Sequence, residues 1–152
     1  MKNLLSPLWL ALILVCGFTG CGAPAYVTAG IRIDATAVER TGDGAVRVTW
    51  RVTNPNVAAY VLARTTHKLV LNGTLVGTLA DSARLGLPPQ STAERSAVLT
   101  PANAAAAAVI DQAVAQGSAA YKLDSTVFLL LEEDKTDKIP FTSSGSVPVT
   151  AK

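Results

Sequence analysis

The stretch VRVTWRVTNPN, Val46 to Asn56, decides the fold class that this chain predicts. Apolar and polar residues alternate over its first eight positions: Val46, Val48, Trp50 and Val52 against Arg47, Thr49, Arg51 and Thr53. A period of two is typical of a strand with one buried face. The strand then meets Asn54, Pro55 and Asn56. Proline favours extended geometry in the residue before it and readily begins a tight turn, so we expect the strand to end there.

The two asparagines of this motif have either an architectural or a chemical role. Asparagine side chains bond nearby backbone groups and tolerate the left-handed region, which suits residues that flank a turn. We therefore interpret Asn54, Pro55 and Asn56 as structural residues that hold the turn together.

The β pattern extends on both sides of this strand. Further strands are predicted over residues 31–40, 67–71, 74–79, 92–99, 121–131 and 138–149. In the first of these, Ile31, Ile33, Ala35 and Ala37 are expected to share one face. Residues 41–44 form a turn signal, and Asn72-Gly73 suits a two-residue hairpin turn. Pro88 and Pro89 cannot donate to a ladder and are expected to break the pattern over residues 85–90.

One helix is predicted, over residues 100–117. Thr100 is expected to cap its first amides, Pro101 to occupy the first helical position, and Gly117 to end it. Val109, Ile110, Ala113 and Val114 fall on one stripe. Six to eight strands with one short helix predict an all-β fold, in which two antiparallel sheets pack face to face as a fibronectin-like β-sandwich.

The first twenty residues have the pattern of an export signal. Lys2 precedes an apolar run from Leu4 to Phe18, and small residues follow. The run is shorter than the about 20 residues of a membrane-spanning helix. Phe18, Thr19 and Gly20 before Cys21 look like a bacterial lipobox, in which Cys21 receives a diacylglycerol group.

Two alternatives to lipidation remain open. The A-x-A pattern at Ala23 to Ala25 also fits ordinary signal peptidase, which would release a soluble protein, and an uncleaved anchor would leave the cysteine inert. Gly22, rather than aspartate, follows the cysteine. In a Gram-negative cell this resembles the pattern sorted to the outer membrane, facing the periplasm.

The charge balance limits the class of partner. Removing residues 1–20 leaves 12 basic residues from 13 against 11 acidic ones, a net charge of +1. Such a chain has no nucleic-acid footprint, so we expect it to meet the membrane through its N-terminal lipid. Client or envelope proteins are the other possible partners.

A search for reactive chemistry finds little. His67 is the sole histidine and is expected on a strand surface, where a catalytic role is a weak alternative. The chain therefore lacks the histidine and cysteine sets that hold zinc. Glu132, Glu133, Asp134 and Asp137 could attract a divalent cation, but their spacing is not that of an EF-hand, and a solvated hairpin turn is preferred. We expect no cofactor, no metal and no enzymatic activity.

The order of these motifs carries a family resemblance. A strand ending in VTNPN, a hairpin with HKLVLNGTLVGTL, a proline-bearing loop, one late helix and a last hairpin after YKL resemble the WHy (water stress and hypersensitive response) domain of late embryogenesis abundant (LEA) type 2 proteins. The resemblance implies a folded β-sandwich associated with desiccation, freezing and other stress. The resemblance implies no catalytic residues for this chain. The predicted organisation is a signal peptide over residues 1–20, a lipidated tether over 21–30 and this domain over 31–150.

The resemblance leaves two hypotheses of different class. In the first, the lipid-anchored domain protects other envelope proteins under stress. In the second, the same domain is a binding module for a lipid or a protein partner, for instance through an added strand at a sheet edge.

Overall fold

The computed structural model describes residues 30–131 and 135–152. These residues form nine strands and one helix. In chain order they are β1 (Arg32–Arg40), β2 (Val46–Asn54), β3 (Tyr60–Leu71), β4 (Thr74–Asp81), β5 (Leu85–Leu87), β6 (Ser91–Val98), β7 (Thr100–Pro101), α2 (Ala105–Gln116), β8 (Ser118–Leu130) and β9 (Thr136–Ala151).

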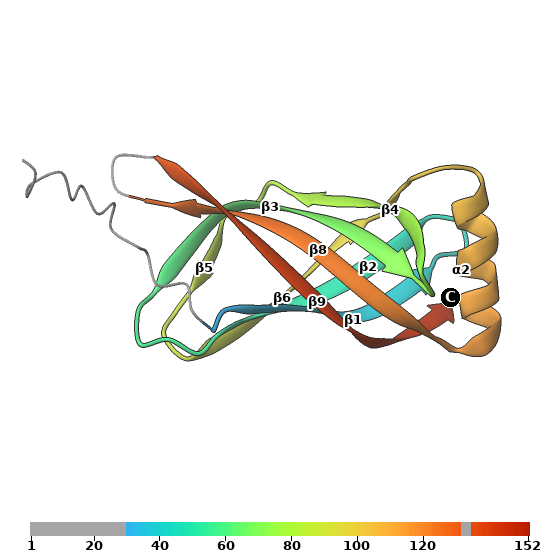
Figure 1. Cartoon of the computed structure of the whole chain (residues 1–152), viewed down its shortest axis with the longest axis horizontal. Coiled ribbons are helices and arrows are strands. Elements are labelled where there is room, and N and C mark those ends of the chain that lie inside the picture. The colour runs from blue at the N-terminus through green and yellow to red at the C-terminus, as the bar shows by residue number, and fades with distance from the viewer. Residues whose placement is uncertain (1–29, 132–134) are drawn as a thin grey trace, which may run out of the picture.

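The strands follow the order β6-β2-β1-β9-β8-β3-β4-β7, with β5 paired to β3. All pairs are antiparallel except β1 with β9, which pair in parallel from Val38 to Arg40 against Val149 to Ala151. The sheet curls at this junction, so that one layer packs against the other (Figure 1). The all-β sandwich is thus confirmed, although its two layers are joined along one side by a parallel pair that was not predicted.

The core lies between the layers and is built by strand alternation. In β2, Val46, Val48, Trp50 and Val52 are buried, as the alternation predicted. In β1 the prediction holds only to Ala35. A bulge at Thr36, whose hydroxyl donates to the Thr49 carbonyl, shifts the register, so Val38 rather than Ala37 is buried.

The Asn72-Gly73 hairpin between β3 and β4 is confirmed. Both residues have positive φ, 48° and 82°, as a two-residue primed turn requires. The flanking strands are longer than predicted, because β3 begins at Tyr60 and β4 ends at Asp81. Residues 85–90 were expected to break the pattern. Instead Leu85–Leu87 forms β5, and only Pro88, Pro89 and Gln90 lie outside the ladder.

The helix begins later than predicted. Thr100 and Pro101 form β7 against Gly77 and Thr78 of β4, so neither residue caps α2. The residue at the cap position is Ala104, and the side-chain oxygen of Asn103 before it accepts from the Ala106 amide at 3.1 Å. Gly117 ends the helix in the left-handed region, as predicted. Ala106, Ile110 and Ala113 are buried, with Val109 and Val114 packed against the core beside them.

The sandwich is elongated and its two ends differ (Figure 1). We call one the helix end, which carries α2 and the Asn72-Gly73 turn. The other, the Asn54 end, carries residues 55–59 after β2, residues 88–90 after β5 and the start of β9, where Lys135, Asp137 and Lys138 are exposed (Figure 1). The described chain enters at the Asn54 end, since a Cβ on Gly30 would lie 2.9 Å from Pro55 Cγ.

Candidate functional site

Asn54 organises the end of the sandwich that bears its name. Its side chain is fully buried. Its Nδ2 donates to the carbonyl oxygens of Ala58 and Pro88, each at 2.8 Å. Its Oδ1 accepts from the Asn56 backbone amide at 3.0 Å and from Asn56 Nδ2 at 3.2 Å. One side chain therefore ties the turn after β2 to the loop after β5.

The two loops that Asn54 joins present an uncharged, largely apolar surface. Val57 is 84% exposed, more than any other large hydrophobic residue that the structure describes. We define the apolar tip as Val57 and the exposed residues around it: Pro55, Ala58, Ala59, Pro88 and Pro89. Neither of the two segments that meet here, residues 52–63 and 85–93, contains a charged residue. The tip thus differs from the mixed, charged surface of the rest of the domain.

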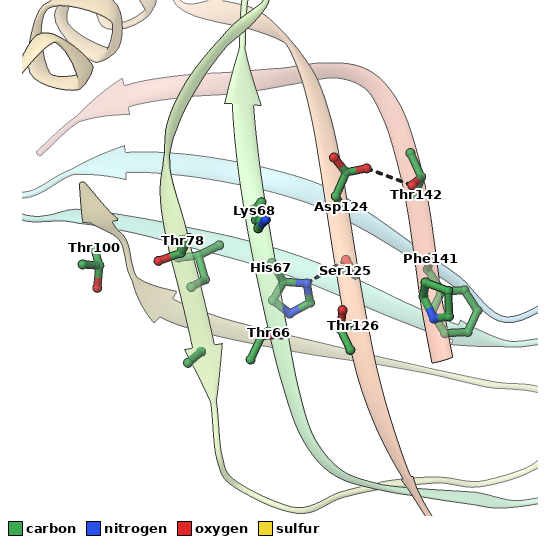
Figure 2. Close-up of a pocket in the computed structure, with 13 residues that line it drawn as sticks. Thr66, His67, Lys68, Thr78, Thr100, Asp124, Ser125, Thr126, Phe141 and Thr142 are labelled. Atoms are coloured by element: carbon green, nitrogen blue, oxygen red, sulfur yellow. Dashed lines mark hydrogen bonds between the residues drawn. The ribbon is translucent and has the colours of Figure 1, made fainter. Parts of the chain in front are cut away.

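An open groove of about 530 Å³ lies on the outer face of the β4-β3-β8-β9 layer. Its side chains alternate along each strand with buried ones. Figure 2 shows the groove with Lys68 and Asp124 on neighbouring strands and threonines on every strand around them. The threonines are Thr66, Thr78, Thr100, Thr126 and Thr142. Because hydroxyls both donate and accept, this face suits a neutral polar ligand or water equally well.

Asp124 is the charged centre of the groove. Lys122 Nζ donates to its Oδ2 at 2.9 Å and the Thr142 hydroxyl to its Oδ1 at 2.8 Å. These two donors lower the pKa of Asp124 below its ordinary value, and the charge of Lys68 acts in the same direction. The carboxylate is therefore ionised and already has donors at neutral pH, unlike a general acid.

His67 is not on the strand surface where it was expected. It is 1% exposed and lies in the core between the layers. Its Nδ1 pairs with the Ser125 hydroxyl at 2.7 Å and its Nε2 with the Thr65 hydroxyl at 3.0 Å. The ring also packs against Trp50, with centroids 4.6 Å apart. Leu69 and Leu71, two and four residues later, are buried on the same face, so strand alternation carried through β3 would have placed His67 inside.

The environment of His67 holds its imidazole neutral. Burial lowers the pKa of His67 from 6.5 to about 4, and the carboxylate of Asp81 opposes this only in part. A neutral ring has one donor and one acceptor, and the two hydroxyls satisfy both. The sole histidine of the sequence is thus almost fully buried and hydrogen-bonded on both ring nitrogens, and it borders the groove with Ser125.

Searches for other chemistry concern only residues 30–131 and 135–152. Within these ranges no group of three or more histidine, cysteine, aspartate or glutamate side chains is placed to hold a metal ion. In the same part of the chain, no helix has both the length and the apolar character needed to cross a bilayer.

Several residues singled out from the sequence lie outside the described residues. They are the lipobox residues Phe18, Thr19, Gly20 and Cys21, and three acidic residues of the last turn, Glu132, Glu133 and Asp134. Asp137, the fourth acidic residue of that turn, is exposed at the start of β9.

Sequence reasoning missed both the apolar tip and the groove. Each charge-free segment of the tip is visible in the sequence, but the two segments lie far apart along the chain. Asn54 Nδ2 also donates to the Leu87 carbonyl at 3.4 Å, across 33 positions. Only the fold brings the two segments together. The groove has a weaker signal still, because threonine is common on any exposed strand face.

No protein-family model matches the chain, and no curated protein matches it. Solved structures of similar shape include a protein from Archaeoglobus fulgidus, 14% identical, with a TM-score of 0.43 over 79% of this chain and 95% of the other. An Arabidopsis thaliana protein is 15% identical, with a TM-score of 0.46 over 80% of this chain and 79% of the other. A candidate late embryogenesis abundant protein is 12% identical, with a TM-score of 0.43 over 79% and 71%. The sandwich assignment itself rests on the strand order, register and core given above.

Proposed function

We propose that the chain is a lipid-anchored cell-envelope protein with a non-enzymatic, stress-protective domain of the LEA type 2 kind. The anchor is Cys21, after the apolar run and the small residues that precede it. The membrane is the outer one in a Gram-negative cell, since Gly22 follows the cysteine.

The observation that carries the protective part is the Asn54-Pro55-Asn56 strand end and the order of elements after it. The motif closes β2, the Asn72-Gly73 hairpin follows, and the helix comes late, before a last long hairpin. This is the order that resembles the WHy domain. The enclosure of His67 supports the non-enzymatic part, because the sole imidazole of the sequence is held away from solvent.

The anchor is tested by expressing the full chain and a Cys21→Ser variant in a bacterium. We expect the first in the membrane fraction, with a mass that includes a diacylglycerol on a chain beginning at Cys21. We expect the variant to remain uncleaved there or to appear unlipidated. A wild-type product that begins after Ala25 and is soluble would overturn the anchor.

Protection is tested in vitro with residues 21–152 carrying Cys21→Ser, so that the protein stays in solution. A drying-sensitive enzyme is dehydrated and rehydrated with this protein or with an equal mass of an unrelated β-sandwich. We expect higher recovered activity with the former. Equal recovery would contradict intrinsic protection.

A second candidate, a binding module for a lipid or a protein partner, is favoured by the apolar tip at one end of the sandwich. Copurification of lipid with the Cys21→Ser protein would support it over protection. Strand addition at β6 is a less suitable route. Arg95 of this edge strand points inward, donates to the Arg84 carbonyl at 3.0 Å and lies 3.8 Å from Asp81, and an inward charge at a sheet edge opposes pairing with another chain.

A further inference from the structure

We infer that the apolar tip is a membrane-contact surface, which rests on the bilayer that holds the lipid anchor and sets the domain's orientation with the helix end away from it. The inference rests on the proposed anchor at Cys21. It adds the occupant of the tip, a phospholipid bilayer interface, and the face of the domain that meets it.

The position of the tip relative to the anchor is the first argument. The described chain begins at Gly30, which lies against Pro55 of the tip. Nine residue steps separate Gly30 from Cys21, a reach of at most about 30 Å. The chain therefore leads from the lipid directly to the Asn54 end, and the helix end lies at the opposite side of the sandwich (Figure 1).

The chemistry of the tip is the second argument. Its side chains are apolar, with Val57 at 84% exposure, and the two segments that form it contain no charge. Val57 and the prolines lose little by leaving water for the headgroup boundary. The exposed charges at this end belong to the start of β9 and not to the two segments of the tip.

The backbone of the tip provides the third argument, because unpaired carbonyls would make contact with a bilayer costly. Asn54 already donates to the carbonyls of Ala58 and Pro88. The Asn56 carbonyl accepts from the Gln90 amide at 3.0 Å, and Pro88 accepts a further bond from the Ser91 hydroxyl at 2.7 Å. Three carbonyls of these loops, those of Asn56, Ala58 and Pro88, are thus paired within the protein, while the apolar side chains remain exposed.

The helix end offers the contrast and the control. It carries an ion pair between Arg40 and Asp111 and another between Lys152 and Glu39. Leu75, just after the Asn72-Gly73 turn, is 42% exposed and is the matched apolar residue at that end. A bilayer contact specific to the tip should include Val57 and leave Leu75 in water.

The test uses the lipidated chain, in which Cys21 carries lipid and no other cysteine remains after residue 20. Val57→Cys and Leu75→Cys are each labelled with an environment-sensitive thiol dye. The proteins are reconstituted in vesicles of phosphatidylethanolamine and phosphatidylglycerol, with and without lipids that carry a quenching nitroxide near the headgroup. We expect a blue shift and nitroxide quenching at position 57 and neither at position 75.

The outcomes separate this inference from the anchor itself. If both labelled chains stay with the vesicles but position 57 behaves like position 75, the tip does not contact the bilayer and the inference fails while the anchor stands. If the dye at position 57 is shielded in native cell membranes but is not quenched by nitroxide lipids in the vesicles, a protein covers the tip and the inference also fails. If neither chain associates with vesicles and the mass lacks lipid, the proposed anchor fails first. Val57→Asp, a change at an exposed side chain, should preserve the fold and reduce the shielding of a dye placed at Ala58→Cys.

Discussion

The two ends of the sandwich are closed by different physics. At the helix end, α2 covers the core by packing the side chains of Ala106, Ile110 and Ala113 against it. At the Asn54 end the loops are joined by hydrogen bonds, most of them to the buried Asn54 amide, and apolar side chains are left outside. A packed end hides its apolar surface, whereas a hydrogen-bonded end can expose apolar side chains while several loop carbonyls are paired. This difference makes the Asn54 end suited to meet an apolar or interfacial partner.

Asn54→Ala should give the largest loss of stability. The substitution leaves the carbonyls of Ala58 and Pro88 without their buried donor and opens a small cavity. We expect about 4 kcal/mol, measured from urea unfolding at constant slope. Asn56→Ala is the matched control at the same turn, since the Asn56 backbone amide can still donate to Asn54. It should cost about 1 kcal/mol or less. Equal losses for the two variants would mean that Asn54 does not close this end alone.

Acid should lower the free energy of unfolding through His67, which lies in the core between the two layers. The pKa of His67 is about 4 in the folded chain and 6.5 in the unfolded one, so the unfolded state binds more protons between these values. The contribution is complete above about pH 6.5 and is lost as the pH falls toward 4. It amounts to roughly 3 kcal/mol from this group. Unfolding free energies measured from pH 7 to 4 should show this slope, and His67→Gln should remove most of it. An unchanged slope in the variant would assign the loss to the carboxylates.

Gly77→Ala should loosen the helix end selectively. A Cβ at this position would lie 2.3 Å from the Thr100 carbonyl oxygen and 2.8 Å from Leu99 Cγ. The β7 strand, which leads into α2, would have to move away from β4. We expect a loss of about 2 to 3 kcal/mol. Hydrogen exchange should increase in α2 and stay unchanged at residues 55–59. Gly86→Ala is the control, because nothing lies within 4 Å of its Cβ, and it should be close to neutral.

Gly117→Ala should give the smallest effect of the series. Its φ of +74° ends α2 in the left-handed region, where alanine is strained. We expect a loss of about 1 kcal/mol in thermal or urea unfolding, with the helix otherwise intact. A loss as large as that of Gly77→Ala would mean that the end of the helix, rather than its approach through β7, controls this end of the sandwich.

Much of the fold was predictable from local patterns, and the misses have physical causes. The β2 alternation, the Asn72-Gly73 turn and the Gly117 stop each depend on residues close in sequence, and all three hold. The helix start failed because Thr100 and Pro101 pair with a strand more than twenty residues away. Ala37 failed because a bulge shifted the register. Such features depend on partners that local periodicity does not contain.

The sites were less predictable than the fold. His67 was misplaced because its polar ring was taken for a surface group, although it alternates in phase with the buried Leu69 and Leu71 of β3. The apolar tip depends on Asn54 drawing together segments from either side of the β3–β4 hairpin. A sequence reading can find each uncharged segment, but their meeting at the end where the chain enters is a property of the folded domain.

The most direct test of the account compares hydrogen exchange in the lipidated chain on membranes with exchange in the Cys21→Ser chain in solution. We expect membrane attachment to slow exchange in the loops at residues 55–59 and 88–90 and to leave the Asn72-Gly73 turn and α2 unchanged. Slowing at the helix end, or no change at either end, would contradict the assignment of the Asn54 end to the membrane.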